Sequence, residues 1–65
     1  SYMSLALKQP HVSLSDLISV GSLVRVNGRD EIFRVSAITK DRQSARVNYR
    51  REYFWCFLSE LRFIA

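Results

Sequence analysis

The sequence predicts an all-β fold, a small barrel or sandwich of five short strands with a short helical turn before the last strand. Two observations from the residues predict an all-β domain. Short runs rich in β-branched and aromatic residues recur at regular intervals, and turn residues such as Asn27-Gly28 separate them. The two possible helix starts, near Ser15 and Leu58, leave room for only one turn each. With 65 residues, one domain with a small core is expected.

Residues 1–15 are predicted to form an arm that precedes a barrel domain over residues 16–65. We expect Met3 to be the natural start and Ser1 and Tyr2 to be added residues. Apolar and polar residues alternate over residues 3–7, and Pro10 ends this pattern. Three outcomes stay open for such an arm: disorder, packing on the barrel, or pairing with the sheet edge of another chain.

Taken in order, the elements begin with a turn over residues 15–20 and Gly21. Strands are predicted at residues 22–26, 31–38, 45–49, 53–57 and 62–64, with a helical turn at 58–61. In the second strand Phe33, Val35 and Ala37 are expected to share one face. The fourth strand is apolar on both faces, so it is either a central strand or carries a binding surface. The predicted core is Val24, Val26, Phe33, Val35, Val47, Trp55 and Leu61.

Charge and composition favour a non-catalytic binding protein with an anionic partner. Ten Lys and Arg against six Asp and Glu give a net charge of +4, and eight of the ten are Arg, the residue suited to phosphate recognition. The alternative is that this charge serves only solubility. No metal and no cofactor are expected, because His11 has no second ligand nearby. No enzyme activity is expected, because the aromatic neighbours of Cys56 also favour its burial and the sequence has no glycine-rich phosphate loop. No apolar run reaches the roughly 20 residues of a membrane span, and the lone Cys56 favours an intracellular location, cytoplasmic or nuclear.

Nucleic acid, RNA or DNA, is the predicted partner. Arginines for phosphates and aromatic rings for base stacking lie together on and beside the hairpin formed by the third and fourth strands. The candidate nucleic-acid-binding residues are Lys40, Arg42, Arg46, Asn48, Tyr49, Arg50, Arg51 and Tyr53. The alternative is that Arg25, Arg34 and Arg46 only solvate the sheet and pair with Asp30, Glu31 and Glu52.

The run Gly21-Ser-Leu-Val-Arg-Val, the run Asp30-Glu-Ile-Phe-Arg-Val, the run Ala45-Arg-Val-Asn-Tyr and the run Leu58-Ser-Glu-Leu-Arg62 together resemble the layout of Tudor and other Src-homology-3-like barrels. The resemblance spans about residues 20–64 and implies a small five-stranded Src-homology-3-like (Tudor-like) barrel with a short helical turn before the last strand. Methylarginine-binding Tudor domains have an Asp-Tyr-Gly-Asn run where this chain has Arg50-Arg51-Glu52-Tyr53. The resemblance also implies a possible aromatic cage of Phe33, Tyr49 and Tyr53. The two arginines at positions 50 and 51 would form its rim and would repel a methylated cation.

A third class, a protein-interaction or homo-oligomeric assembly module, also fits the residues. The apolar arm at residues 3–7 and the two-sided apolar strand at residues 54–57 support it, because open sheet edges accept an added strand. RNA, DNA, a peptide and a second copy of the chain all stay open as ligands.

Overall fold

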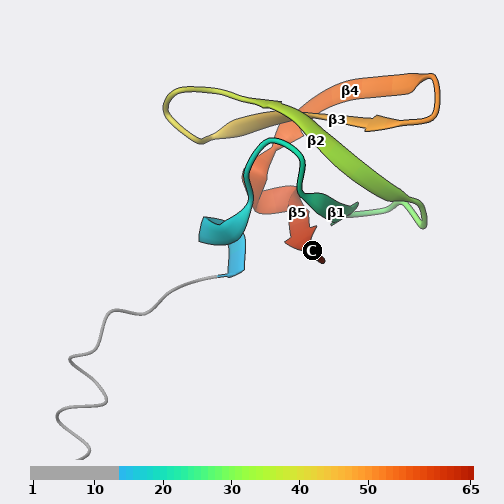
Figure 1. The fold of residues 1–65 in the computed structure, drawn as a ribbon, viewed down its shortest axis with the longest axis horizontal. Helices are drawn as coiled ribbons and strands as arrows, with labels where there is room; N and C mark the ends of the chain where they lie inside the picture. Colours follow the sequence, from blue (N-terminus) through green and yellow to red (C-terminus); the bar gives the residue numbers. More distant parts are fainter. Residues whose placement is uncertain (1–13) are drawn as a thin grey trace, which may run out of the picture.

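A computed structural model describes residues 14–65, so most of the predicted arm lies outside the described residues. The described chain forms η1 (Leu14–Leu17), β1 (Leu23–Val26), β2 (Ile32–Ile38), β3 (Ser44–Tyr49), β4 (Glu52–Phe57), η2 (Leu58–Glu60) and β5 (Leu61–Phe63) (Figure 1). Each predicted strand is present, with its ends displaced by no more than one residue. The predicted all-β class is confirmed.

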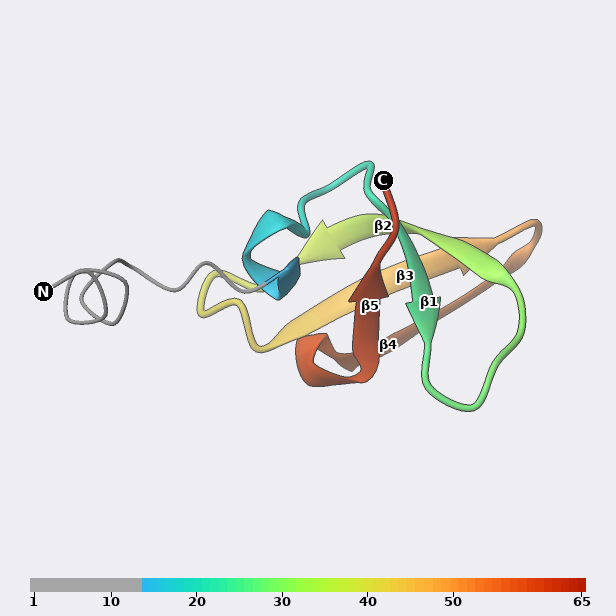
Figure 2. The same ribbon diagram turned by 90° about the horizontal axis from the view of Figure 1, so that it is seen from below.

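The strands form one antiparallel five-stranded sheet in the order β4-β3-β2-β1-β5. Strands β1 to β4 pair with their neighbours in the chain, and η2 then returns the chain so that β5 lies beside β1 (Figure 2). Pairing among residues 14–65 therefore leaves β4 and β5 as the two edges. Strand β4 is not central, so the first of the two explanations for its apolar faces is wrong.

A β-bulge changes the alternation along β2. Val35 pairs with Val47, but Ala37 pairs with Arg46 and Ile38 with Ala45, so the register shifts between Val35 and Ala37. Both Val35 and Ile38 consequently face the core, while Ala37 shares the opposite face with Arg46. The expectation that Ala37 lies on the same face as Phe33 and Val35 is wrong for this reason.

The core lies on one face of the sheet, the inner face. Its buried residues are Ile18, Val24, Val26, Phe33, Val35, Ala45, Val47, Leu58 and Leu61. Six of the seven predicted core residues are among them, and the exception is Trp55, which is 53% exposed. Strand β4 covers the core with Phe54 and Cys56, and the two-residue period therefore directs Trp55 outward.

An arginine clamp, formed by Arg29, ties the start of β4 to the turn between β1 and β2. The Arg29 guanidinium pairs with Glu31 at 2.6 Å and Glu52 at 2.7 Å. It also lies 5.2 Å from the ring centroid of Phe33 and 5.7 Å from that of Phe54. The clamp closes one end of the core between β2 and β4. In the described part of the chain, no helix is long and apolar enough to cross a membrane.

Candidate functional site

Three exposed aromatic side chains line the outer face of β4. Tyr53 is 66% exposed, Trp55 53% and Phe57 61%. They occur at every second residue, about 6.8 Å apart along the strand, because alternate residues of a strand share a face. We call this row the aromatic ladder. Large apolar side chains gathered on one exposed face are unusual in a monomeric domain, which makes this face the candidate site.

A polar row on β3 runs beside the ladder. Asn48 lies opposite Tyr53, Arg46 opposite Trp55 and Ser44 opposite Phe57. The Arg46 guanidinium lies 5.9 Å from the centroid of the Tyr53 ring, within reach of a cation–π contact. The outer face of this hairpin thus alternates rings with groups that can donate hydrogen bonds.

A serine hydroxyl on β2 positions two residues of this polar row. Arg46 Nε donates to Ser36 Oγ at 2.8 Å, and Ser36 Oγ in turn hydrogen-bonds Asn48 Oδ1. Ser36 follows the inward Val35, so the two-residue period of the strand directs its hydroxyl to the outer face, next to the register shift. The side chains of Arg46 and Asn48 are therefore held in place on the outer face by the serine.

Two arginines form the tip of the hairpin between the paired residues Tyr49 and Glu52. Arg50 and Arg51 are both exposed. Arg50 has a positive φ of 53°, and its guanidinium lies 5.4 Å from the Tyr49 ring centroid. The tip therefore places two positive charges at one end of the aromatic ladder.

The arginines of the outer face keep their charge available. Within residues 14–65, both ion pairs involve Arg29, so Arg46, Arg50 and Arg51 have no carboxylate partner there. The expected alternative, pairing of Arg25, Arg34 and Arg46 with the acidic residues of the hairpin tips, is not found. Arg25 donates instead to Asp30 O at 2.7 Å, and Arg34 donates to Gly21 O at 2.8 Å. Arg46 donates to Ser36 Oγ.

The structure brings together five of the eight predicted nucleic-acid-binding residues. Arg46, Asn48 and Tyr53 share the outer face, and Arg50 and Arg51 form its tip. Tyr49 instead lies half-buried on the inner side, with its ring centroid 5.7 Å from that of Phe33. Lys40 is exposed in the loop between β2 and β3.

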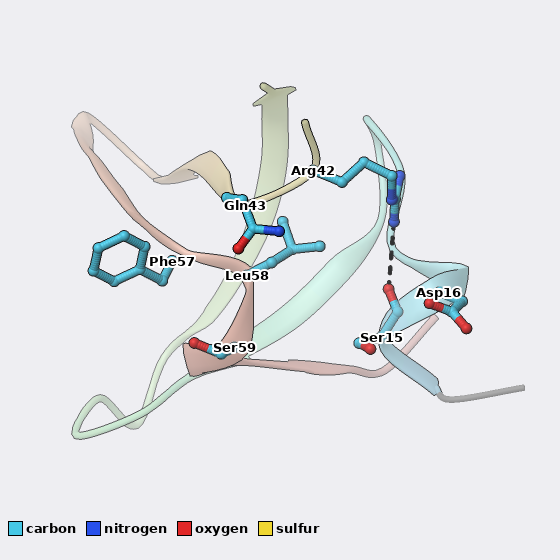
Figure 3. Close-up of a pocket in the computed structure, with 7 residues that line it drawn as sticks. All are labelled: Ser15, Asp16, Arg42, Gln43, Phe57, Leu58 and Ser59. Carbon is cyan, nitrogen blue, oxygen red and sulfur yellow. Dashed lines mark hydrogen bonds between the residues drawn. The ribbon is translucent and has the colours of Figure 1, made fainter. Parts of the chain in front are cut away.

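Arg42, the last of the eight predicted residues, makes a contact within the fold. Its Nη2 donates to Ile18 O at 2.9 Å and to Ser15 O at 3.4 Å, which ties the loop between β2 and β3 to η1. Figure 3 shows this side chain at the wall of a hollow of about 460 Å³. The hollow is lined by Ser15, Asp16, Arg42, Gln43, Phe57, Leu58 and Ser59, so Phe57 joins it to the end of the ladder.

The possible aromatic cage is not formed. Phe33 is fully buried, and Tyr49 packs against it on the inner side. Tyr53 pairs with Asn48 and therefore points to the outer face. The three rings lie on two faces of the sheet and enclose no common space.

The described residues contain few groups suited to metal or acid–base chemistry. Among residues 14–65 no cluster of three or more His, Cys, Asp or Glu side chains is found. Burial raises the pKa of the Cys56 thiol, with a further contribution from Glu60, so this half-buried thiol stays protonated at neutral pH. The Arg29 guanidinium lowers the pKa of Glu31, and this pair belongs to the clamp of the core.

Trp55 and Phe57 belong to the exposed surface but were not predicted as part of it. The signal for them in the sequence was the two-sided apolar pattern of residues 53–57, whose outward face becomes identifiable once β4 is known to be an edge strand. Comparison with known proteins gives no further guide to this surface, because no protein family, curated protein or solved structure matches the chain.

Proposed function

We propose that this domain is a non-catalytic module that binds single-stranded nucleic acid on the outer face of its β3–β4 hairpin. The observation that carries the proposal is the exposed aromatic ladder beside arginines without carboxylate partners. The scaffold we propose is a small Src-homology-3-like barrel, in which the bent sheet presents this hairpin outward.

The residue types on this face match the chemistry of an unpaired strand. Unstacked bases gain about 1–3 kcal/mol each by stacking on an aromatic ring, whatever their sequence. In a duplex the bases are already stacked on one another, so the ladder would have no flat surface to contact. Arg46 and the tip arginines supply charge for the phosphates that flank the stacked bases.

Trp55 makes the proposal measurable, since it is the only tryptophan of the chain. Its fluorescence should be quenched when short single-stranded oligonucleotides are added and should change little with a duplex of the same sequence. Tyr53→Ala should weaken binding about 5- to 150-fold, the equivalent of one lost stacked base. Both titrations are run at several salt concentrations.

A charge-matched pair of variants separates specific phosphate contacts from net charge. Arg50→Ala/Arg51→Ala removes two charges at the tip, and Arg25→Ala/Arg62→Ala removes two from the cross-strand pair at the opposite edge. The tip variant should lower the slope of log affinity against log salt by about 1.4 for two single-strand phosphate contacts. Equal losses in both variants, or equal affinity for duplex and single strand, would contradict the proposal.

A further inference from the structure

The outward edge of β4 carries unpaired backbone groups. Leu58 N–H donates to Gln43 O at 2.8 Å, so the backbone groups of Leu58 point toward the β3 side of this hairpin. Because these groups alternate in an antiparallel pair, Phe54 and Cys56 also bond to β3, and Tyr53, Trp55 and Phe57 direct their N–H and C=O groups away from it. Within residues 14–65 no other strand pairs with that edge.

This edge lacks the features that usually prevent strand addition. Edge strands are commonly protected by proline, lysine, a bulge or inward charges, whereas residues 53–57 read Tyr-Phe-Trp-Cys-Phe. The other edge is much less available. Strand β5 has only three residues, and the N–H of its first residue, Leu61, already donates to Leu58 O.

We propose that two copies of the chain associate by antiparallel pairing of β4 with β4 around a twofold axis at Trp55. The outward-pointing groups at positions 53, 55 and 57 are symmetric about Trp55. Trp55 therefore pairs with Trp55 of the second copy, and Tyr53 with Phe57. Every outward backbone group of this segment gains a partner, and the two sheets join into one.

The side chains support the same register. A twofold axis perpendicular to the sheet keeps both outer faces on one side, so the two aromatic ladders lie next to each other. Tyr53 then stands beside Phe57 of the second copy, and the two Trp55 rings stand beside each other. Cross-strand aromatic pairs of this kind stabilise antiparallel strands.

Charge complementarity selects a second copy in this orientation. Antiparallel pairing brings the tip arginines of one copy toward η2 of the other, where Glu60 is exposed. A hollow of about 300 Å³ lined by Ser44, Trp55, Cys56, Phe57 and Glu60 lies at that end of β4. Aromatic walls with one carboxylate suit a guanidinium group, and the axis repeats this contact at both ends. A parallel arrangement would instead place the two arginine tips together.

The test is analytical ultracentrifugation of the full chain, without nucleic acid, over a wide concentration range. The wild type should sediment as a concentration-dependent dimer. Trp55→Pro removes an N–H that the sheet does not use, and proline is tolerated where the N–H faces away from the sheet. It should be monomeric throughout, while Trp55→Val keeps the N–H and should still dimerise, more weakly. Circular dichroism checks that both variants are folded.

A charge reversal tests the register with exposed residues that do not endanger the fold. Glu60→Arg should raise the dimer dissociation constant about tenfold, because two symmetric contacts become repulsive. Arg51→Glu/Glu60→Arg should restore it. A monomeric wild type, a dimeric Trp55→Pro or a monomeric Trp55→Val would overturn pairing through the strand backbone. Assemblies larger than a dimer, or no effect of Glu60→Arg, would overturn the twofold arrangement.

Discussion

Replacement of Trp55 by alanine should leave the domain folded. If the Trp55 ring lay in the core, the same substitution would unfold a domain of this size. Trp55 is 53% exposed, whereas Phe33 is fully buried. Phe33 also lies 5.7 Å from the ring centroid of Tyr49 and 5.4 Å from that of Phe54. Trp55→Ala therefore removes an exposed ring, whereas Phe33→Ala would remove a buried ring of the same sheet.

The magnitudes follow from the area that each ring covers. A large aromatic side chain buries about 150–250 Å² when fully enclosed, so the covered half of Trp55 amounts to roughly 100 Å². At about 25 cal/mol per Å² this is worth up to roughly 2.5 kcal/mol, and less once the compactness of the unfolded chain is counted. Phe33→Ala should remove about 3–5 kcal/mol, because it also leaves a cavity. A domain of this length has only about 3–10 kcal/mol in total.

Urea unfolding followed by far-ultraviolet circular dichroism measures both values, since the variant has no tryptophan for fluorescence. Measurements at low protein concentration keep association from adding to the stability. Trp55→Ala should show a complete cooperative transition at a modestly lower midpoint, and Phe33→Ala should show a much lower midpoint or no folded baseline. A loss for Trp55→Ala as large as that for Phe33→Ala would refute the assignment of Trp55 to the surface.

Three further predictions concern the tip, the clamp and the thiol. Arg50→Gly should leave stability unchanged or raise it by up to about 1 kcal/mol in urea unfolding, because glycine relieves the positive φ of 53°, whereas Arg51→Gly should lower it. The lowered pKa of Glu31 means that its stabilising effect is present above its ordinary value of 4.5 and is lost as the pH falls through the lower folded value. Unfolding midpoints should therefore drop in acid, and less so in Glu31→Gln. Alkylation of Cys56 at mildly alkaline pH should be slower than that of a free thiol and faster in Glu60→Gln. A rate in the wild type equal to the free thiol's would contradict the burial that raises its pKa.

The strands were predictable because their signals are local. Asn27-Gly28 marks a tight turn, and the alternation of Val24 and Val26 with Arg25 gives the buried face of β1 directly. The same alternation around Phe54 and Trp55 does not say which of two apolar faces is covered. That depends on the strand order, which places β4 at an edge through pairing with distant residues.

The candidate site was predictable in part for a similar reason. Arg46, Asn48 and Tyr53 were found because they belong to one hairpin and alternate with its inward residues. The inward position of Tyr49 follows from the same period. The hydrogen bonds of Ser36 with Arg46 and Asn48 depend on how β2 lies against β3, and the contact of Arg42 with Ile18 O joins residues far apart in the chain. Such long-range contacts are decided by the packed fold.

The two proposals reinforce each other through charge. Each copy carries +4, so two copies repel one another except where Glu60 meets the arginine tip. A bound oligonucleotide neutralises part of that charge, and the paired ladders would offer it a surface twice as wide. By linkage, if nucleic acid raises the dimerisation constant by some factor, it must bind the dimer more tightly than the monomer by that factor. Adding a short single strand should therefore shift sedimentation toward the dimer, and Trp55→Pro should bind it more weakly than Trp55→Val. Dispersal of dimers into monomers by the oligonucleotide would instead show that bases and the second copy compete for the same ladder.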